Sequence, residues 1–191
     1  MSRRRLLAYG AATGAVALDR AGSASAASSA GDGKLVSDTL AVELLLVFVY
    51  GQVLESGKLG AAAHALARLI LVHEQAHVDA LESELAGLGT APPPAPATIQ
   101  QADAQLAKLH GSLSLTGLRA EHDCLDLLYD VESIAIGAQY NALKDLTDPR
   151  LMSTAAEIMG AEAQHSAMIG ELLHPGKFER IVPVASVRGK P

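Results

Sequence analysis

The amino-acid sequence predicts an all-α fold, a four-helix bundle made of two antiparallel helix hairpins that a long crossover joins. The chain has 191 residues, of which 49% are apolar but only 3% aromatic. A β-sandwich or barrel needs many more aromatic and β-branched residues, so this composition favours helices. Four long stretches have a strongly helical sequence, and three of them carry helix start or stop residues. The length indicates one domain.

The first 26 residues are expected to be an export signal peptide. Three arginines at positions 3–5 precede an apolar run over 6–18, and an Ala-Ser-Ala sequence ends at Ala26. The apolar run has 13 residues, whereas a bilayer span needs about 20. No stable membrane span is therefore expected after cleavage. The opening Ser-Arg-Arg-x-Leu-Leu is similar to a twin-arginine signal. We therefore expect an exported protein, which is periplasmic, in the cell envelope or secreted.

The first hairpin follows a short N-terminal segment. Residues 27–36 are rich in Ser, Gly and Ala and are expected to be flexible. The bundle itself is expected over 37–174, and its first helix follows the N-cap residues Ser37-Asp38 and ends near Gly57. The second helix is expected over about 59–86. The connection near Gly57 is short, so these two helices should be antiparallel neighbours.

A long crossover separates the two hairpins. Its proline-rich stretch, 91–96, cannot be helical and predicts an extended segment. Thr98 and Gln101 then form the pattern of a capping box, which predicts a short helix to about Leu109. Two hairpins joined in this way differ from a simple up-down-up-down bundle.

The second hairpin has clear boundaries at its second helix. Its first helix is expected to begin near 116–118 and to end near Lys144. Asp148 is a good N-cap with Pro149 at the first helical position, and this helix should end at Leu173. Residues 175–191 are expected to form a C-terminal tail without recognisable chemistry.

Each of the four helices carries a glutamate where its apolar face should be. Glu43 is the clearest case, because apolar residues surround it on every side of the first helix. An unpaired buried carboxylate costs several kcal/mol or takes up a proton. The same phase argument applies elsewhere: Ile70, Leu81 and Leu85 lie within about 40° of Glu74 on a helix. The candidate metal ligands are Glu43, Glu74, His77, Glu132, Glu162 and His165.

The spacing of these residues repeats in the two halves of the chain. Glu43 and Glu74 are 31 residues apart, Glu132 and Glu162 are 30 apart, and the second member of each pair begins a Glu-x-x-His motif. A glutamate from each of two helices with Glu-x-x-His from the other two is the ligand set of di-iron and di-manganese carboxylate proteins. A third Glu-x-x-His, at Glu171, lies about 180° around the helix from Glu162 and is interpreted as solvent-exposed.

On these motifs the chain resembles the ferritin-like superfamily, most of all the small exported bacterial ferritin-like proteins that include desiccation-related relatives. The resemblance covers about 38–174. It implies a ferritin-like bundle that holds two iron ions, with manganese as the alternative. It further implies the ligand roles: Glu43 and Glu132 as single ligands, Glu74 and Glu162 as bridging carboxylates, and His77 and His165 as terminal nitrogen ligands. The chain lacks rubredoxin-like cysteines and a clear fifth helix.

The function expected from the sequence is oxidation of Fe²⁺ or reduction of O₂ or peroxide, with no catalytic residue beyond the metal ligands. The alternative is a non-enzymatic stress- or desiccation-related envelope protein whose metal is structural or absent. The net charge is −6, and removal of a leader with four arginines and one aspartate leaves −9. No basic face for nucleic acid is therefore expected. A homodimer is one oligomeric state that the sequence leaves open.

Several neighbours of the candidate ligands have two interpretations. Tyr50, seven residues after Glu43, is interpreted as a core tyrosine, with contact to a ligand or a role as an electron donor as the alternatives. Gln139 has the same relation to Glu132, and it either packs in the core or bonds to a ligand. His73 and His64 are interpreted as residues at the boundary of the helix's buried face.

Overall fold

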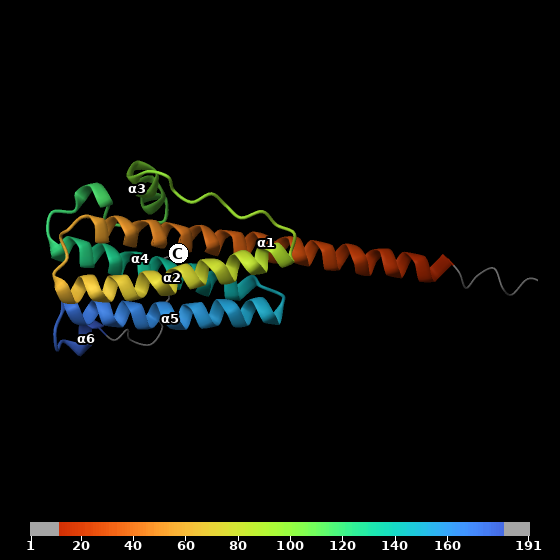
Figure 1. The fold of residues 1–191 in the computed structure, drawn as a ribbon. Coiled ribbons are helices and arrows are strands. Elements are labelled where there is room, and N and C mark those ends of the chain that lie inside the picture. The colour runs from red at the N-terminus through yellow and green to blue at the C-terminus, as the bar shows by residue number, and fades with distance from the viewer. Residues whose placement is uncertain (1–11, 182–191) are drawn as a thin grey trace, which may run out of the picture.

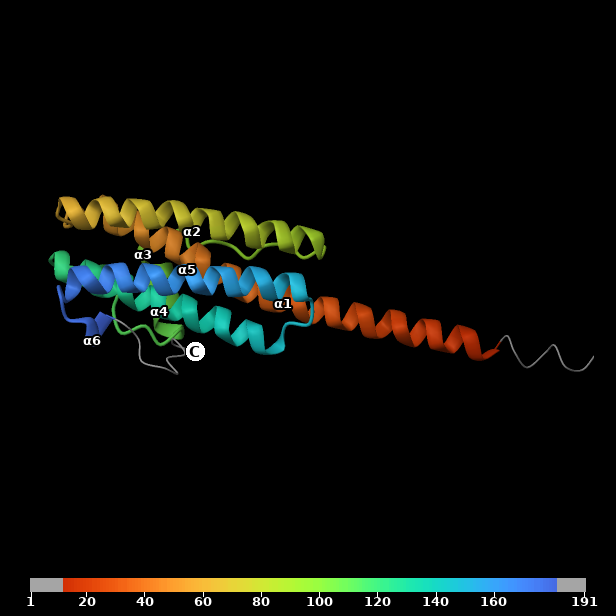
Figure 2. The same cartoon turned by 90° about the horizontal axis from the view of Figure 1, so that it is seen from below.

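The four long helices form one bundle. The structure is a computed structural model that describes the backbone of residues 12–181 and the side chains from residue 29 onward, except that of Arg180. The bundle helices are α1 (Ala12–Glu55), α2 (Ala61–Gly87), α4 (Glu121–Asp145) and α5 (Pro149–Leu173). Helix α1 pairs with α2, α4 pairs with α5, and α1 also packs on α4 (Figures 1 and 2). Residues 12–181 contain no strand, which confirms the all-α prediction.

The crossover between the hairpins contains a short helix where the capping box predicts one. Helix α3 (Ile99–Lys108) is followed by a single 3₁₀ turn, η1 (Leu115–Gly117), before α4 begins. The Thr98 side chain accepts a hydrogen bond from the backbone N–H of Gln101, and the Gln101 side chain accepts one from Ala97 at 2.7 Å. The proline-rich stretch before it has no helix. Helix α3 packs on α1, outside the bundle (Figure 1).

Local signals mark several ends of the helices, but α4 begins at Glu121, after η1, and not near 116–118 as expected. The Asp148 carboxylate accepts a hydrogen bond from the backbone N–H of Arg150 at 2.8 Å, and Pro149 opens α5 as predicted. Helix α1 stops at Glu55, and Gly57 adopts a φ of 66°, which is a left-handed conformation that favours glycine. No long fifth helix follows α5 within the described residues, where α6 (Phe178–Ile181) has four residues.

The start of α1 differs from the expected one. The helix begins at Ala12 instead of after Ser37, and its first turns extend beyond the bundle (Figure 1). The stretch 29–36, expected to be flexible, is helical, and Asp32 and Val36 in it are buried. The Asp32 carboxylate accepts hydrogen bonds at 2.9–3.0 Å from both donors of Thr147 and from the Asp148 backbone. This contact ties the segment to the α4–α5 connection. Residues 1–11 of the expected signal peptide lie outside the described residues.

The buried apolar side chains form two clusters, one toward each end of the bundle. The larger cluster includes Leu46, Ile70, Ile134 and Ile169, and the smaller one includes Leu40, Leu81, Leu151 and Ile158. On every long helix the buried glutamate lies between a residue of one cluster and a residue of the other. The buried glutamates thus form a polar layer, and apolar side chains separate this layer from both ends of the bundle.

One described helix passes a test for membrane spans by length and composition. This is the stretch Ser29–Glu55 of α1, with a mean hydropathy of 1.5 in its most apolar window. Of that window 56% is buried inside the bundle. Core helices of globular proteins and signal sequences meet the same criterion, so this finding alone does not place the chain in a membrane.

Candidate metal centre

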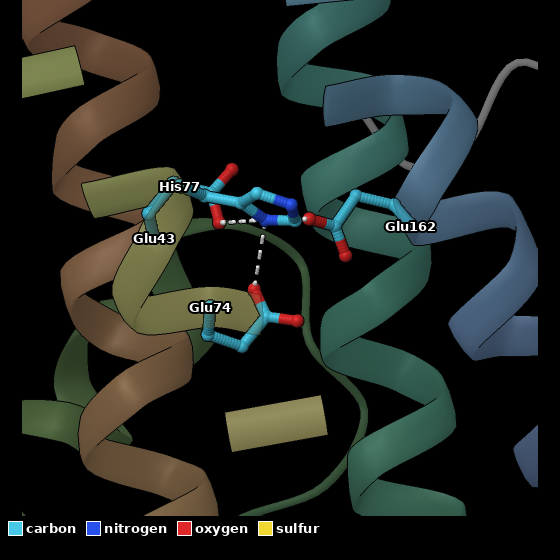
Figure 3. A group of neighbouring side chains, drawn as sticks. All are labelled: Glu43, Glu74, His77 and Glu162. Carbon is cyan, nitrogen blue, oxygen red and sulfur yellow. Dashed lines mark ion pairs between the residues drawn. The ribbon is translucent and has the colours of Figure 1, made fainter. Parts of the chain in front are cut away.

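The six predicted ligands meet in the polar layer between the two apolar clusters. Helix α1 contributes Glu43, α2 contributes Glu74 and His77, α4 contributes Glu132, and α5 contributes Glu162 and His165. All four glutamates are 0% exposed, and His165 is 2% exposed. Figure 3 shows the imidazole of His77 among the carboxylates of three different helices. The angular position of these residues around each helix, relative to its apolar residues, thus predicts that their side chains face the interior of the bundle.

The six residues form two overlapping groups of possible ligand atoms. Within each group the ligand atoms lie within 4.8 Å of one another. The first group is Glu43, Glu74, His77 and Glu162, and the second is Glu74, Glu132, Glu162 and His165. Because Glu74 and Glu162 belong to both groups, two cations could be held side by side with these carboxylates between them. Carboxylate oxygens and imidazole nitrogens suit iron and manganese.

Many of the atoms that face this layer are buried without a hydrogen bond. They are Glu43 Oε2, both oxygens of Glu74, His77 Nδ1, Glu132 Oε2 and Glu162 Oε1. Yet His77 Nδ1 is only 2.8 Å from a Glu162 oxygen, so these atoms are close without being aimed at each other. A buried polar atom without a partner costs about 1–3 kcal/mol. The atoms converge as ligands of a cation do, and the cluster fits a pair of metal ions.

Burial and mutual contact shift the pKa values of the cluster strongly. Burial raises the pKa of Glu43 to about 8 and that of Glu132 well above its usual value. Burial lowers the pKa of the two histidines, but the negative charges of the adjacent carboxylates outweigh it and raise the pKa of His77 to about 12 and of His165 to about 11. Burial raises the pKa of Glu162, but close contact with Glu132 and the two histidines lowers it to about 2. The metal-free cluster therefore holds protons that a cation would displace.

The two single glutamates are each held by a side chain from the other half of the chain. The Tyr50 hydroxyl donates a hydrogen bond to Oε1 of Glu132, and the Gln139 amide donates one to Oε1 of Glu43 at 2.9 Å. In both glutamates Oε2 stays unbonded. Burial raises the pKa of Tyr50 well above its usual value, as does the adjacent Glu132, so the phenol remains a donor. Tyr50 is thus a core tyrosine that also contacts a candidate ligand.

Sequence reasoning missed one residue beside the cluster. His73, interpreted as a boundary residue, places its Nδ1 3.0 Å from Nε2 of His165, and the two rings stack with centroids 5.2 Å apart. His73 is exposed, so no pattern of burial could have identified it. In contrast, Glu171 is exposed, as predicted, and accepts a hydrogen bond from the backbone of Gly176.

These observations define a class of protein: an all-α bundle with a buried Glu/His cluster that could bind metal. The chain belongs to the ferritin-like domain family, whose model matches residues 23–175. It is also similar to the crystal structure of a conserved hypothetical protein from Mycobacterium tuberculosis, with a TM-score of 0.65. The two are 18% identical over 78% of this chain and 94% of that chain, a likeness that shows the fold alone. A search of curated proteins found no match.

Proposed function

We propose that this protein binds two iron ions in the Glu/His cluster and uses them to oxidise Fe²⁺ or to reduce O₂ or peroxide. The observation that carries the proposal is the pair of ligand groups that share Glu74 and Glu162, with buried oxygens left unbonded. Four ionised carboxylates bring four negative charges and two divalent cations bring four positive charges. The bound layer would therefore be neutral, which makes its burial tolerable.

Two ferrous ions held by these residues would supply the two electrons that, with two protons, convert one peroxide molecule to two water molecules. The chain's own residues set the conditions for this chemistry. Tyr50 and Gln139 fix one oxygen of each single glutamate, so that the other oxygen faces the centre. The apolar clusters on both sides exclude water from the bundle ends. Carboxylates also adapt to a change in metal charge, because each can bind through one oxygen or two.

The metal in the proposal is iron, and manganese is the alternative within the same class. Carboxylate and imidazole ligands suit both metals, so the ligand set does not choose between them. Elemental analysis of the protein isolated from its native compartment distinguishes the two. Iron at about two ions per chain supports the proposal, whereas manganese at that ratio moves it to manganese-dependent peroxide chemistry.

Anaerobic titration of the purified mature protein with Fe²⁺ tests the proposal. We expect two ions per chain and a ferric absorbance band when air or peroxide is admitted. The variant Glu132→Ala should lose the oxidation, and Glu171→Ala is the matched control because it removes an exposed glutamate from a Glu-x-x-His outside the cluster. Fewer than two bound ions, or no ferric band in the wild type, would overturn the proposal.

A non-enzymatic envelope protein with a structural or absent metal is the second candidate. One observation favours it: His77 lies 2.8 Å from a Glu162 oxygen and His165 2.9 Å from a Glu74 oxygen, so protonated histidines can balance the buried acids without metal. Under this candidate Glu132→Ala keeps or raises stability in the absence of metal, and there is no oxidation to lose. Under the redox proposal the variant stays folded while oxidation stops.

We also infer that the protein is exported after cleavage of residues 1–26. The arginines at 3–5 and the apolar run behind them support a signal peptide, and a twin-arginine route would export the protein already folded. A cut after Ala26 keeps Asp32 and its contact with the α4–α5 connection in the mature chain. N-terminal sequencing of the native protein tests this inference, and an intact Met1 on the exported protein would contradict it.

A further inference from the structure

The two halves of the metal centre match in their ligands but not in the residues around them. The ligands repeat at an offset of 88–89 residues, and this offset pairs Tyr50 with Gln139 and His73 with Ala161. Tyr50 and Gln139 do the same work, since each donates a hydrogen bond to the single glutamate of the other half. Each of the two single glutamates therefore has a hydrogen-bond donor that holds one of its oxygens. His73 has no such counterpart, because alanine has no polar side-chain atom.

His73 contacts the outer nitrogen of one candidate ligand. The Nδ1 atom of His165 faces the cluster, 2.9 Å from Glu74 and 3.4 Å from Glu132. Its Nε2 atom faces away and lies 3.0 Å from Nδ1 of His73. If Nδ1 of His165 gives its lone pair to a cation, Nε2 must carry the hydrogen and can donate it to His73. This hydrogen bond fixes both the tautomer and the orientation of the His165 ring.

His77 has no equivalent support. Its Nδ1 faces the cluster at 2.8 Å from Glu162. Within the part of the chain that the structure describes, no residue forms a hydrogen bond with its Nε2. Its side chain is 13% exposed, compared with 2% for that of His165. The ring of His77 is therefore held less firmly and lies closer to solvent.

We propose that His73 is a positioning residue that makes the Glu132–His165 position bind its metal ion more tightly than the Glu43–His77 position. The inference rests on the proposed dinuclear centre and adds an order of filling: the position supported by His73 fills first. Removal of an outer partner from a metal-binding histidine lowers metal affinity by about 10–100-fold. We expect an affinity difference of that size between the two positions, although their ligands are the same in type.

Anaerobic titration with Co²⁺, followed by its visible absorption, tests the order of filling. The wild type should show two separate steps. His77→Ala should keep the tight step and His165→Ala should lose it, which assigns the tight step to its position. A wild type that binds fewer than two Co²⁺ ions overturns the dinuclear centre and this inference together. Two ions bound with equal affinity overturn this inference alone.

Variants of His73 test its role directly, and they should fold because the residue is exposed. His73→Ala should weaken the tight step about 10–100-fold and leave the weak step unchanged. His73→Asn places an acceptor oxygen near the position of Nδ1 and should restore most of the affinity. His64→Ala, on the same helix outside both ligand groups, is the matched control. Equal weakening of both steps, or no change in either, contradicts the proposal.

A spectroscopic measurement separates this role from a merely structural one. In zinc-loaded protein with ¹⁵N-labelled histidine, the Nε2–H of His165 should give a slowly exchanging proton signal. The signal should disappear in His73→Ala and return in His73→Asn. A signal that persists in His73→Ala would show that another group holds His165, and His73 would then not be the positioning residue.

Discussion

The metal-free protein should lose stability when the pH rises from 5 to 8. Burial raises the pKa of Glu43 from 4.5 to about 8, so over this range the folded chain keeps a proton that the unfolded chain has lost. Each such proton lowers the free energy of unfolding by about 1.4 kcal/mol per pH unit. Over three pH units Glu43 alone therefore accounts for a loss of about 4 kcal/mol, a large part of the about 5–15 kcal/mol that holds a typical domain folded.

The pKa shifts of the other groups in the cluster either add to this loss of stability or leave the stability unchanged between pH 5 and 8. The raised pKa of Glu132 adds to the loss over the whole range. The raised pKa values of His77 and His165 add to it only above about 6.5, where the unfolded chain loses its histidine protons. The lowered pKa of Glu162 contributes stability that is fully present above about 4.5. Its contribution is therefore constant over this range.

Urea unfolding followed by circular dichroism, in the presence of a chelator, measures this dependence. Glu43→Gln removes the titrating group. The slope of its free energy of unfolding against pH should therefore be smaller by the amount that one bound proton contributes. Glu82→Gln, which changes an exposed carboxylate of α2, is the matched control and should keep the wild-type slope. A wild-type stability that stays constant or rises from pH 5 to 8 would refute the reasoning.

Three other predictions concern protons and single contacts. Binding of two divalent cations at pH 7 should release about two or more protons per chain; calorimetry in buffers of different ionisation enthalpy measures the number, and no release would contradict the pKa shifts. Tyr50→Phe should lower the free energy of unfolding without metal by about 1–3 kcal/mol, because the buried Glu132 loses its donor. Tyr129→Phe is its control, and equal losses would rule out a specific role for the Tyr50 hydroxyl. Asp32→Ala should lower the free energy of unfolding by about 2–4 kcal/mol through loss of three hydrogen bonds to the α4–α5 connection. A loss below about 1 kcal/mol in urea unfolding would show that this contact does not anchor α1.

Local chemistry explains why most helix boundaries could be predicted. Asp148 and Pro149 act within one turn of the helix they begin, and so do Thr98 and Gln101. The start of α1 has no such signal. Its Ser-, Gly- and Ala-rich stretch shows no apolar periodicity, and Asp32 is buried because of a partner more than a hundred residues further along the chain. A contact of that separation cannot be inferred from local sequence.

The same distinction between local signals and contacts of distant residues applies to the residues of the site. Helical phase alone places Glu43, Glu74, Glu132 and Glu162 on inward faces, since their neighbours along each helix are apolar. The seven-residue spacing also places Tyr50 near the level of the centre. It does not show that Tyr50 bonds to a carboxylate of the other half, because that contact depends on how α1 packs against α4.

The buried acids are themselves an argument that the fold is built to hold a ligand. Replacement of buried ionic groups by apolar residues of similar volume is often neutral or stabilising. A bundle shaped by stability alone would therefore have apolar side chains at Glu43, Glu74, Glu132 and Glu162, in continuity with the clusters on either side. Instead these positions hold carboxylates whose inward oxygens lack hydrogen bonds. Departures from the rules of packing concentrate at functional sites, and here one departure on each long helix meets in a single layer, where two cations would supply the charge that the four acids require.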